Sequence, residues 1–313
     1  MISEVARETS ACRICGGRQW IDWIVAPDYR SKQGGSYQYT RCQQCGVGVI
    51  EPLPTPEAIS AFYQDDYYSY SGSLNVFYKV RLLIYRLLSW LNIGFQDGVS
   101  GWSTIGGYPR GNVQFLDFGC GAGTVLRIVG SDKVEACGVE FSELAVARGK
   151  TNSLKMFCSL EELETGSFDI VRAWHVFEHL DDPLRYLRGI NRVLKDGGVL
   201  ALAVPSSDSW LLRVFHEHWS SLDAPRHLYL FNQRSLCFLL EKAGYQIVKS
   251  KLYNSGSLSS SVYLYLSGRY GLKLNFLLSN MCIALLTVVE MITRGHDSCF
   301  IIAKKNKHDT SIN

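Results

Sequence analysis

The sequence has no strong excess of charge of either sign. Its 32 Lys and Arg residues nearly balance 29 Asp and Glu residues, which leaves a formal net charge of +3. A surface this close to neutral argues against a nucleic-acid partner, because such partners are attracted by strongly basic faces. Residues 1–30 also have no basic stretch followed by an apolar run, so no signal peptide is predicted and a cytoplasmic location is expected.

Proline is scarce as well, and internal repeats are absent. Three of the 8 prolines are Pro52, Pro54 and Pro56, which exclude helix there and predict a stiff, extended segment. The 313 residues, 47% hydrophobic and 19% charged, are typical of a globular chain with one large core and a small appendage.

The cysteines fall into two groups. Cys12 and Cys15 form one Cys-x-x-Cys pair, Cys42 and Cys45 form another, and each pair runs into glycine. Two such pairs predict a structural four-cysteine Zn²⁺ ribbon, with free or disulfide-bonded cysteines as the alternative. Six others stand singly in apolar stretches, which is typical of buried thiols in a reducing compartment: Cys120, Cys137, Cys158, Cys237, Cys282 and Cys299.

From Val113 onward, short apolar runs alternate with helical stretches. Such runs, bounded by glycine or aspartate, predict buried parallel strands and a doubly wound α/β sheet with ligand sites at the carboxyl ends of its strands. The clearest predicted helix covers 183–195, which begins with proline and ends before Asp196-Gly197-Gly198. The predicted strands are 113–118, 134–140, 154–158, 168–173, 198–204, 246–253 and 298–304.

A glycine-rich turn joins the first of these strands to a helix. Gly119, Gly121 and Gly123 alternate with other residues after Asp117, and Glu140 ends the next strand. Alternate glycines let the backbone approach a ligand closely, and a carboxylate at that distance can bind ribose hydroxyls. Nicotinamide binding and a purely structural turn are the alternatives.

The letters around this turn, D-F-G-C-G-A-G and G-V-E-F-S, resemble the nucleotide site of class I S-adenosylmethionine (SAM) dependent methyltransferases. The stretch 168–183, with its E-H and D-P letters, and V-L-K-D-G-G-V-L resemble later motifs of the same family. The resemblance implies a Rossmann-like seven-stranded methyltransferase sheet. It assigns the following residues to SAM: Asp117, Gly119, Gly121, Gly123, Glu140, Ser159, Leu160 and Ala173.

Three polar clusters compete for the chemistry. His175, Glu178 and His179 follow the fourth predicted strand, where a similar stretch binds a divalent cation in ubiquinone O-methyltransferases; a helix-start pair is the alternative. The segment 223–231 resembles a loop of sugar C-methyltransferases that carries a catalytic histidine. It predicts His227 as general base and Asp223 as the residue that orients it.

Arg226 in the same loop is expected to be free to bind an anionic substrate group such as a diphosphate. A network that only anchors the loop is the alternative for all three residues. The third cluster, His216, Glu217 and His218, lacks a further ligand and is interpreted as a solvated loop.

The predicted domains are a zinc ribbon (1–56), a helical linker or lid (57–105) and a methyltransferase domain (106–305) with a helical insertion (254–296). Residues 272–292 approach the length of a membrane span, but Glu290 and polar residues interrupt them. They are interpreted as a buried or dimer-forming helix, or as a peripheral contact with the inner membrane together with 74–95. The oligomeric state stays open.

The N-terminal ribbon joined to such a core resembles enzymes of bacterial surface-polysaccharide and deoxysugar biosynthesis. The expected function is therefore SAM-dependent methyl transfer to a small or lipid-linked metabolite, a sugar in the first place. O-methylation of a quinone or secondary metabolite is one alternative. Methylation of RNA gripped by the ribbon is another, although the small net charge speaks against it.

Overall fold

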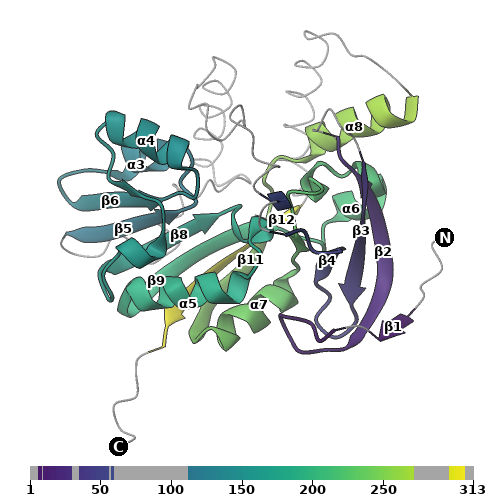
Figure 1. The fold of residues 1–313 in the computed structure, drawn as a ribbon, viewed down its shortest axis with the longest axis horizontal. Coiled ribbons are helices and arrows are strands. Elements are labelled where there is room, and N and C mark those ends of the chain that lie inside the picture. Colours follow the sequence, from purple (N-terminus) through teal and green to yellow (C-terminus); the bar gives the residue numbers. More distant parts are fainter. Residues whose placement is uncertain are drawn as a thin grey trace, which may run out of the picture.

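The computed structural model describes residues 6–8, 10–29, 35–55, 58–59, 112–270 and 296–306. These residues form two sheets, a large one flanked by helices and a smaller one at the other end of the molecule (Figure 1). Most of the predicted linker 57–105 and both apolar segments, 74–95 and 272–292, lie outside the described residues. No helix in the described part is long and apolar enough to cross a membrane.

The large sheet has seven strands in the order β11-β12-β9-β8-β5-β6-β7. The five strands from β5 to β9 run parallel to one another, while β12 is antiparallel to both β9 and β11. The predicted doubly wound sheet is therefore confirmed. Its strands are β5 (Val113–Phe118), β6 (Val134–Val139), β7 (Met156–Phe157), β8 (Phe168–Trp174), β9 (Leu194–Pro205), β11 (Tyr245–Tyr253) and β12 (Ser298–Lys305).

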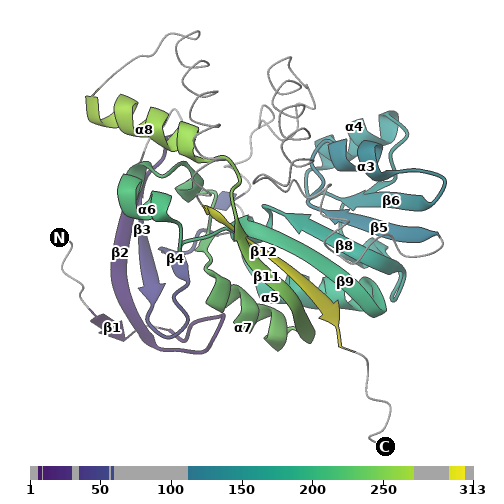
Figure 2. The same ribbon diagram turned by 180° about the vertical axis from the view of Figure 1, so that it is seen from behind.

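Helices cover both faces of this sheet (Figures 1 and 2). On one face α3 (Thr124–Val129) and α4 (Glu143–Thr151) enclose Val113 and Phe115, and on the other α5 (Pro183–Val193) and α7 (Gln233–Lys242) enclose Leu116 and Phe118. Successive residues of a strand point to opposite faces. This is why β5 carries apolar residues at both odd and even positions.

Helix α5 shows how the local sequence sets an element. Asp182 caps it by accepting a hydrogen bond from the Arg185 backbone N–H at 3.1 Å, and proline stands in its first turn, where no N–H is needed. Leu187, Ile190 and Val193 recur at helical spacing and are fully buried. The helix ends at Val193, two residues before the predicted end, because Leu194 already begins β9.

The smaller sheet contains four N-terminal strands and one strand from far along the chain. Its order is β1 (Ala6–Glu8), β2 (Gln19–Pro27), β3 (Ser36–Cys42), β4 (Gly48–Glu51) and β10 (Tyr229–Leu230). Antiparallel β10 places Tyr229 opposite Val49 and Leu230 opposite Gly48. The predicted ribbon, residues 1–56, thus shares its sheet with the segment that the sequence marked as a catalytic loop.

One apolar core runs through both sheets. Tyr39, Val47 and Ile50 of the ribbon belong to the same buried cluster as Leu116 and Phe231. Two further helices are α6 (Trp210–Phe215) and α8 (Leu258–Tyr270). Helix α8 belongs to the predicted insertion 254–296. The ribbon is therefore packed onto the core rather than tethered to it.

Candidate active site

The glycine turn after β5 has the backbone that the sequence predicted. Gly119, Gly121 and Gly123 all have positive φ, at 76°, 53° and 72°, a conformation that favours glycine. A Cβ on Gly119 would lie 2.3 Å from a methyl carbon of Val176. Because Val176 follows β8, this glycine also lets the carboxyl ends of β5 and β8 come together.

Glu140 closes this turn from the neighbouring strand. Its two carboxylate oxygens accept hydrogen bonds from the backbone N–H of Gly121 at 2.8 Å and of Ser142 at 3.2 Å. Burial raises the pKa of Glu140. A carboxylate offers about four acceptor positions, so Glu140 can still accept from a ribose hydroxyl, and the bare glycine backbone and this acid together fit a SAM nucleoside.

Asp117, expected beside the cofactor, is paired inside the protein. It is 1% exposed, and its Oδ1 accepts a hydrogen bond from Nη1 of Arg172 at 2.6 Å. The Arg172 guanidinium lies over the Trp174 ring at 5.0 Å, and its Nε is buried without a hydrogen-bond partner among the described residues. Burial raises the pKa of Asp117 against the effect of Arg172.

The remaining cofactor candidates lie at two places along the same edge. Ser159 begins the short η3 helix (Leu160–Glu162), where its backbone N–H donates to Glu162 at 3.0 Å, and the Leu160 side chain is buried in the core. Ala173 in β8 is fully buried opposite Phe118. The Leu160 and Ala173 side chains are part of the core, so contact with a ligand there would come from their backbone, whereas Ser159 is only partly buried.

The four N-terminal cysteines come together as predicted. Sγ of Cys12 lies 3.8 Å from Sγ of Cys45, and Sγ of Cys15 lies 3.6 Å from Sγ of Cys42; all four sulfurs are within 4.8 Å of one another. A tetrahedral Zn²⁺ with Zn–S bonds of about 2.3 Å separates its sulfurs by about 3.8 Å. The hydrogen bond between Cys12 and Cys45 lowers the pKa of Cys12 to about 5 and raises the pKa of Cys45, so one thiolate of this pair is favoured.

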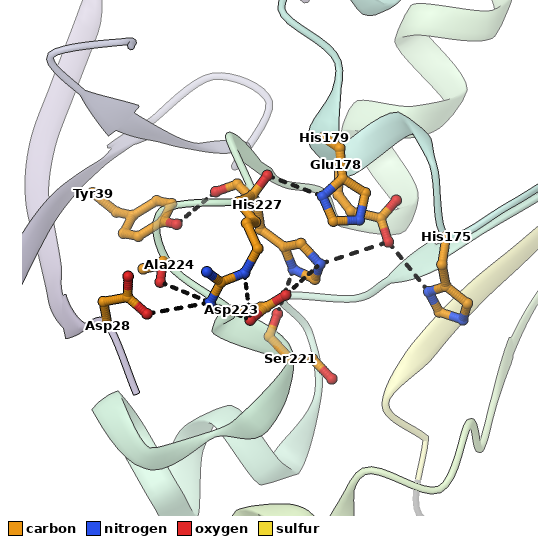
Figure 3. A network of polar contacts seen from close by, with 10 residues as sticks. Asp28, Tyr39, His175, Glu178, His179, Ser221, Asp223, Ala224 and His227 are labelled. Atoms are coloured by element: carbon orange, nitrogen blue, oxygen red, sulfur yellow. Dashed lines mark hydrogen bonds and ion pairs between the residues drawn. The ribbon is translucent and has the colours of Figure 1, made fainter. Parts of the chain in front are cut away.

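A second group of polar residues lies at the carboxyl end of β8 (Figure 3). His175 directly follows the strand and has a φ of 54°, a strained conformation for a non-glycine residue. Its Nδ1 is 3.3 Å from Oε1 of the buried Glu178, and its Nε2 is 3.2 Å from the Tyr253 hydroxyl. The His175 side chain is 30% exposed, so a substrate can reach it.

Glu178 is the charge that organises this group. Its side chain is 1% exposed, and its Oε2 has no hydrogen-bond partner among the described residues. Burial tends to raise the pKa of Glu178, but the hydrogen bond from His175 and the positive charge of nearby histidines outweigh it and lower that pKa. Ionised Glu178 accepts the Nδ1–H of His175, which leaves Nε2 as a proton acceptor.

His227, the base predicted from sequence, lies deeper. Its side chain is 8% exposed, and its Nδ1 donates to the Ser221 carbonyl oxygen, with 2.8 Å between the two atoms. Its Nε2 is 4.0 Å from both Glu178 and Asp223, too far for a hydrogen bond. Burial, with the charge of His179, lowers the pKa of His227 to about 4.

Arg226 is not free to bind an anion, and that prediction is wrong. Its side chain is 6% exposed and forms ion pairs with Asp223 at 2.9 Å and with Asp28 of the ribbon at 3.3 Å. Asp223, expected to orient His227, is therefore engaged by Arg226. Because Asp28 follows β2, this pair also fastens the ribbon to the loop before β10 (Figure 3).

Glu178, His179 and His227 lie close enough to share a cation, with one ligand atom from each within 4.8 Å of the others. His179 Nδ1 donates to the Arg226 carbonyl oxygen, 3.0 Å away, as His227 Nδ1 does to Ser221. Both histidines thus keep Nε2 available as a ligand. His216, Glu217 and His218 of the third cluster contribute no ligand atom to this group.

Sequence reasoning did not find several residues of the site. Tyr253 comes from β11, Arg172 from the middle of β8, and Asp28 and Tyr39 from the ribbon; the Tyr39 hydroxyl donates to the His227 carbonyl oxygen at 2.6 Å. No local pattern marks them, although the arginine within the apolar stretch at the end of β8 was an available signal, since buried charges are paired.

Comparisons with known proteins agree with this geometry. Residues 93–250 match a family model described as "Methyltransferase domain". The chain is 30% identical over 167 residues to a ubiquinone biosynthesis O-methyltransferase of Ruegeria sp. (strain TM1040), covering 46% of this chain and 64% of that one. A protein with the same description from Bradyrhizobium sp. (strain ORS 278) is 31% identical over 175 residues, or 48% of this chain and 67% of that one.

A solved SAM-dependent methyltransferase from Archaeoglobus fulgidus is 22% identical, with a TM-score of 0.46, and the match covers 72% of this chain and 94% of that one. The chain spans about two thirds of the length of the curated relatives named above. The family model matches about half of the chain, over the strands and loops that build the candidate site. The chain therefore belongs to the methyltransferase-domain family.

Proposed function

We propose that this protein transfers the methyl group of SAM to a hydroxyl oxygen of a small or lipid-linked metabolite. The observation that carries the proposal is that the candidate cofactor site and a candidate proton acceptor lie at the same edge of the large sheet. The glycine turn with Glu140 lies at the ends of β5 and β6, and the His175–Glu178 pair lies at the end of β8. Ligands of doubly wound sheets bind at this edge.

Glu140 and the glycine turn would hold the nucleoside of SAM, and the Asp117–Arg172 pair its zwitterionic amino-acid end. An ion pair can share its charges with an ammonium and a carboxylate, and Arg172 still has a buried Nε without a partner among the described residues. When bound, SAM supplies a methyl group that is electrophilic because it sits on a sulfonium. As the new oxygen–carbon bond forms and the sulfur–carbon bond breaks, the hydroxyl proton must leave.

His175 is the proton acceptor that the geometry favours over His227. It is more exposed, its Nδ1 is held by Glu178, and its Nε2 is within reach of a hydroxyl, that of Tyr253. Glu178 would stabilise the imidazolium that results, as the carboxylate of a catalytic triad does. His227, Asp223 and His179 would then be positioning residues that keep Glu178 and its loop in place.

An oxygen acceptor is favoured over the sugar carbon considered from sequence. The curated relatives named above are described as O-methyltransferases of ubiquinone biosynthesis, which act on an oxygen. We therefore place the quinol or phenol class ahead of sugars. The four ribbon cysteines would bind a structural Zn²⁺, since all four coordination positions are filled by protein.

The proposal is tested with zinc-loaded full-length protein, radiolabelled SAM and two acceptor sets, catechol-type phenols and sugar nucleotides. We expect label in the phenols. We expect His175→Asn to lower kcat by about 10²–10⁴-fold, since asparagine tolerates the left-handed backbone at this position. The variant should bind S-adenosylhomocysteine like the wild type.

The matched comparison is His227→Asn, which should lower kcat less than His175→Asn does. Undiminished turnover by His175→Asn would remove His175 as the proton acceptor. Absence of any binding of SAM or S-adenosylhomocysteine would remove the proposed function itself.

A further inference from the structure

The last residue of β8 lies between the two halves of the candidate site. The centroid of the Trp174 indole is 5.0 Å from the guanidinium carbon of Arg172 and 5.4 Å from the centroid of the Tyr253 ring. The imidazole of His175 meets the same indole edge-on, with 6.1 Å between the centroids. Arg172 belongs to the pair assigned to the amino-acid end of SAM, and His175 is the proposed proton acceptor. Trp174 therefore lies between the groups that the reaction must bring together.

The topology of the large sheet explains why these rings meet. Residues two apart on a strand point to the same face, so Trp174 shares its face of the sheet with Arg172. Strands β12 and β9 separate β11 from β8, and the residue of β9 opposite Trp174 is Ala203. Because alanine has only a methyl side chain, the longer side chains of Trp174 and Tyr253 can extend toward each other above β9.

The surroundings of the indole are apolar. Ala203, Tyr253 and Phe300 belong to a small buried cluster that is separate from the main core, and Trp174 packs against it, with 5.6 Å between the Trp174 and Phe300 ring centroids. These three residues are buried, whereas Trp174 and the adjacent His175 are only partly buried. The indole thus offers an accessible aromatic surface directly beside the proposed base.

This surface favours a flat ligand with a polar group at one end. The polar end is formed by Nε2 of His175 and the Tyr253 hydroxyl, which are 3.2 Å apart, and one hydroxyl of a ligand can meet this pair. The rest of such a ligand faces the indole, and a planar aromatic ring gains there because aromatic rings pair in stacked or edge-on arrangements. A sugar ring would place hydroxyls against apolar atoms without hydrogen-bond partners, which is costly.

We infer that Trp174 determines the specificity for the acceptor, because its indole contacts the planar aromatic ring whose hydroxyl lies at the His175–Tyr253 pair. The inference rests on the proposed function and names the residue that selects the substrate. In the reaction, the O–H proton of the acceptor passes to Nε2 of His175 while the oxygen–carbon bond forms and the sulfur–carbon bond of SAM breaks. The products are the methyl ether, S-adenosylhomocysteine and an imidazolium held by Glu178.

The test measures KM and kcat of the zinc-loaded full-length protein with radiolabelled SAM and catechol, and the affinity for S-adenosylhomocysteine by calorimetry. Trp174→Leu, which removes the aromatic surface but stays apolar, should raise KM for catechol about tenfold or more and change the S-adenosylhomocysteine affinity less than about twofold. Trp174→Phe keeps an aromatic ring and should raise KM less. Trp23→Leu is the matched control with wild-type KM, because Trp23 of the ribbon is also partly buried and also has an arginine, Arg41, over its ring.

A measurement on the wild type guards against a Trp174 change that disturbs folding. With S-adenosylhomocysteine bound, the wild type should bind catechol about tenfold or more tightly than cis-cyclohexane-1,2-diol, which has two neighbouring hydroxyls on a ring that is not planar. Equal affinity for the two diols would overturn the inference. So would an unchanged KM in Trp174→Leu, or a loss of S-adenosylhomocysteine affinity as large as the loss for catechol. Each of these results, with a phenol still methylated by the wild type, would leave the proposed function standing.

Discussion

At the scale of single residues, the candidate site is a set of buried charges that neighbouring polar groups hold. Asp117 is neutralised by Arg172 and Asp223 by Arg226, and Glu178 is held by its contact with His175. A buried charge without such a partner would shift to its neutral form or destabilise the fold. Substitutions can show whether each pair serves ligand binding or the stability of the fold, because affinity and the free energy of unfolding are measured separately.

Replacing Arg172 by methionine should weaken S-adenosylhomocysteine binding by about tenfold or more, because a charge-assisted hydrogen bond contributes about 1.5–3 kcal/mol. The informative comparison ligand is 5′-methylthioadenosine, which has the nucleoside but no amino acid. Calorimetry should give the same affinity for it in the variant and the wild type. Equal losses for both ligands would show that Arg172 supports the fold of the site rather than the carboxylate.

His227 should make stability depend on pH. Its pKa is about 4 in the folded protein because of burial and the charge of His179, against Asp223 and Glu178, which act in the opposite direction; the usual value is 6.5. The unfolded chain therefore binds the extra proton first. The stabilisation is complete above pH 6.5 and is lost as pH falls toward 4, by about 3 kcal/mol in total.

Urea unfolding between pH 4 and 7 measures this effect. The His227→Gln variant, which cannot titrate, should show a flatter dependence on pH over that window. Identical slopes in the two proteins would mean that other groups account for the acid sensitivity.

At the scale of elements, the short strand β10 connects the later part of the chain to the N-terminal ribbon. It adds a fifth strand to the ribbon sheet, and the segment just before it carries Asp223, Arg226 and His227. The Leu228 backbone N–H also donates to the Glu178 carbonyl oxygen at 2.7 Å, while the Ile50 N–H of β4 donates to the Leu228 carbonyl oxygen at 3.0 Å. The ribbon thus sets the position of the loop that contacts Glu178.

Tyr39→Phe tests this connection with the loss of one atom. The change removes the hydrogen bond from β3 to the His227 carbonyl oxygen and leaves that buried oxygen without its donor, at a cost of about 1–3 kcal/mol. Tyr37→Phe, two residues earlier on the same strand and only partly buried, is the control and should change the free energy of unfolding by less than about 0.5 kcal/mol. Equal effects of the two substitutions would contradict a specific role for the Tyr39 hydroxyl.

At the scale of the whole molecule, the ribbon and the large sheet share one apolar cluster. A small four-cysteine unit depends on its metal for much of its folding free energy. Because its core continues into that of the large sheet, the two parts should unfold together. A Zn²⁺ bound by the four cysteines would then stabilise the candidate active site although it lies outside it.

Removal of zinc with a strong chelator should lower Tm by roughly 10 °C or more and reduce methyl transfer in parallel. Cys15→Ser should imitate the chelator, whereas Cys158→Ser, a partly buried thiol outside the cluster, should not. Calorimetric scans should show one cooperative transition. A separate early transition, with the main Tm unchanged, would mean that the ribbon is independent of the core.

The sequence by itself determined the local features of this protein. Its strands and the helix α5 follow from apolar period and capping, and the glycine turn and the paired cysteines follow from residues close together in the chain. These patterns predicted the doubly wound sheet and the position of Glu140 beside the glycine turn. They also located the segments 175–179 and 223–227, because each carries three polar residues within five positions.

Only the tertiary structure decided how those segments meet. Arg226 looks like an anion-binding residue in sequence, but Asp28, which neutralises it, is contributed by a different sheet. The pairing of β10 with β4, the contact of Tyr253 with His175, and the meeting of the Trp174 and Tyr253 rings likewise join residues far apart in the chain. Burial and long-range pairing set the charge and accessibility of each side chain, and neither is encoded in local spacing.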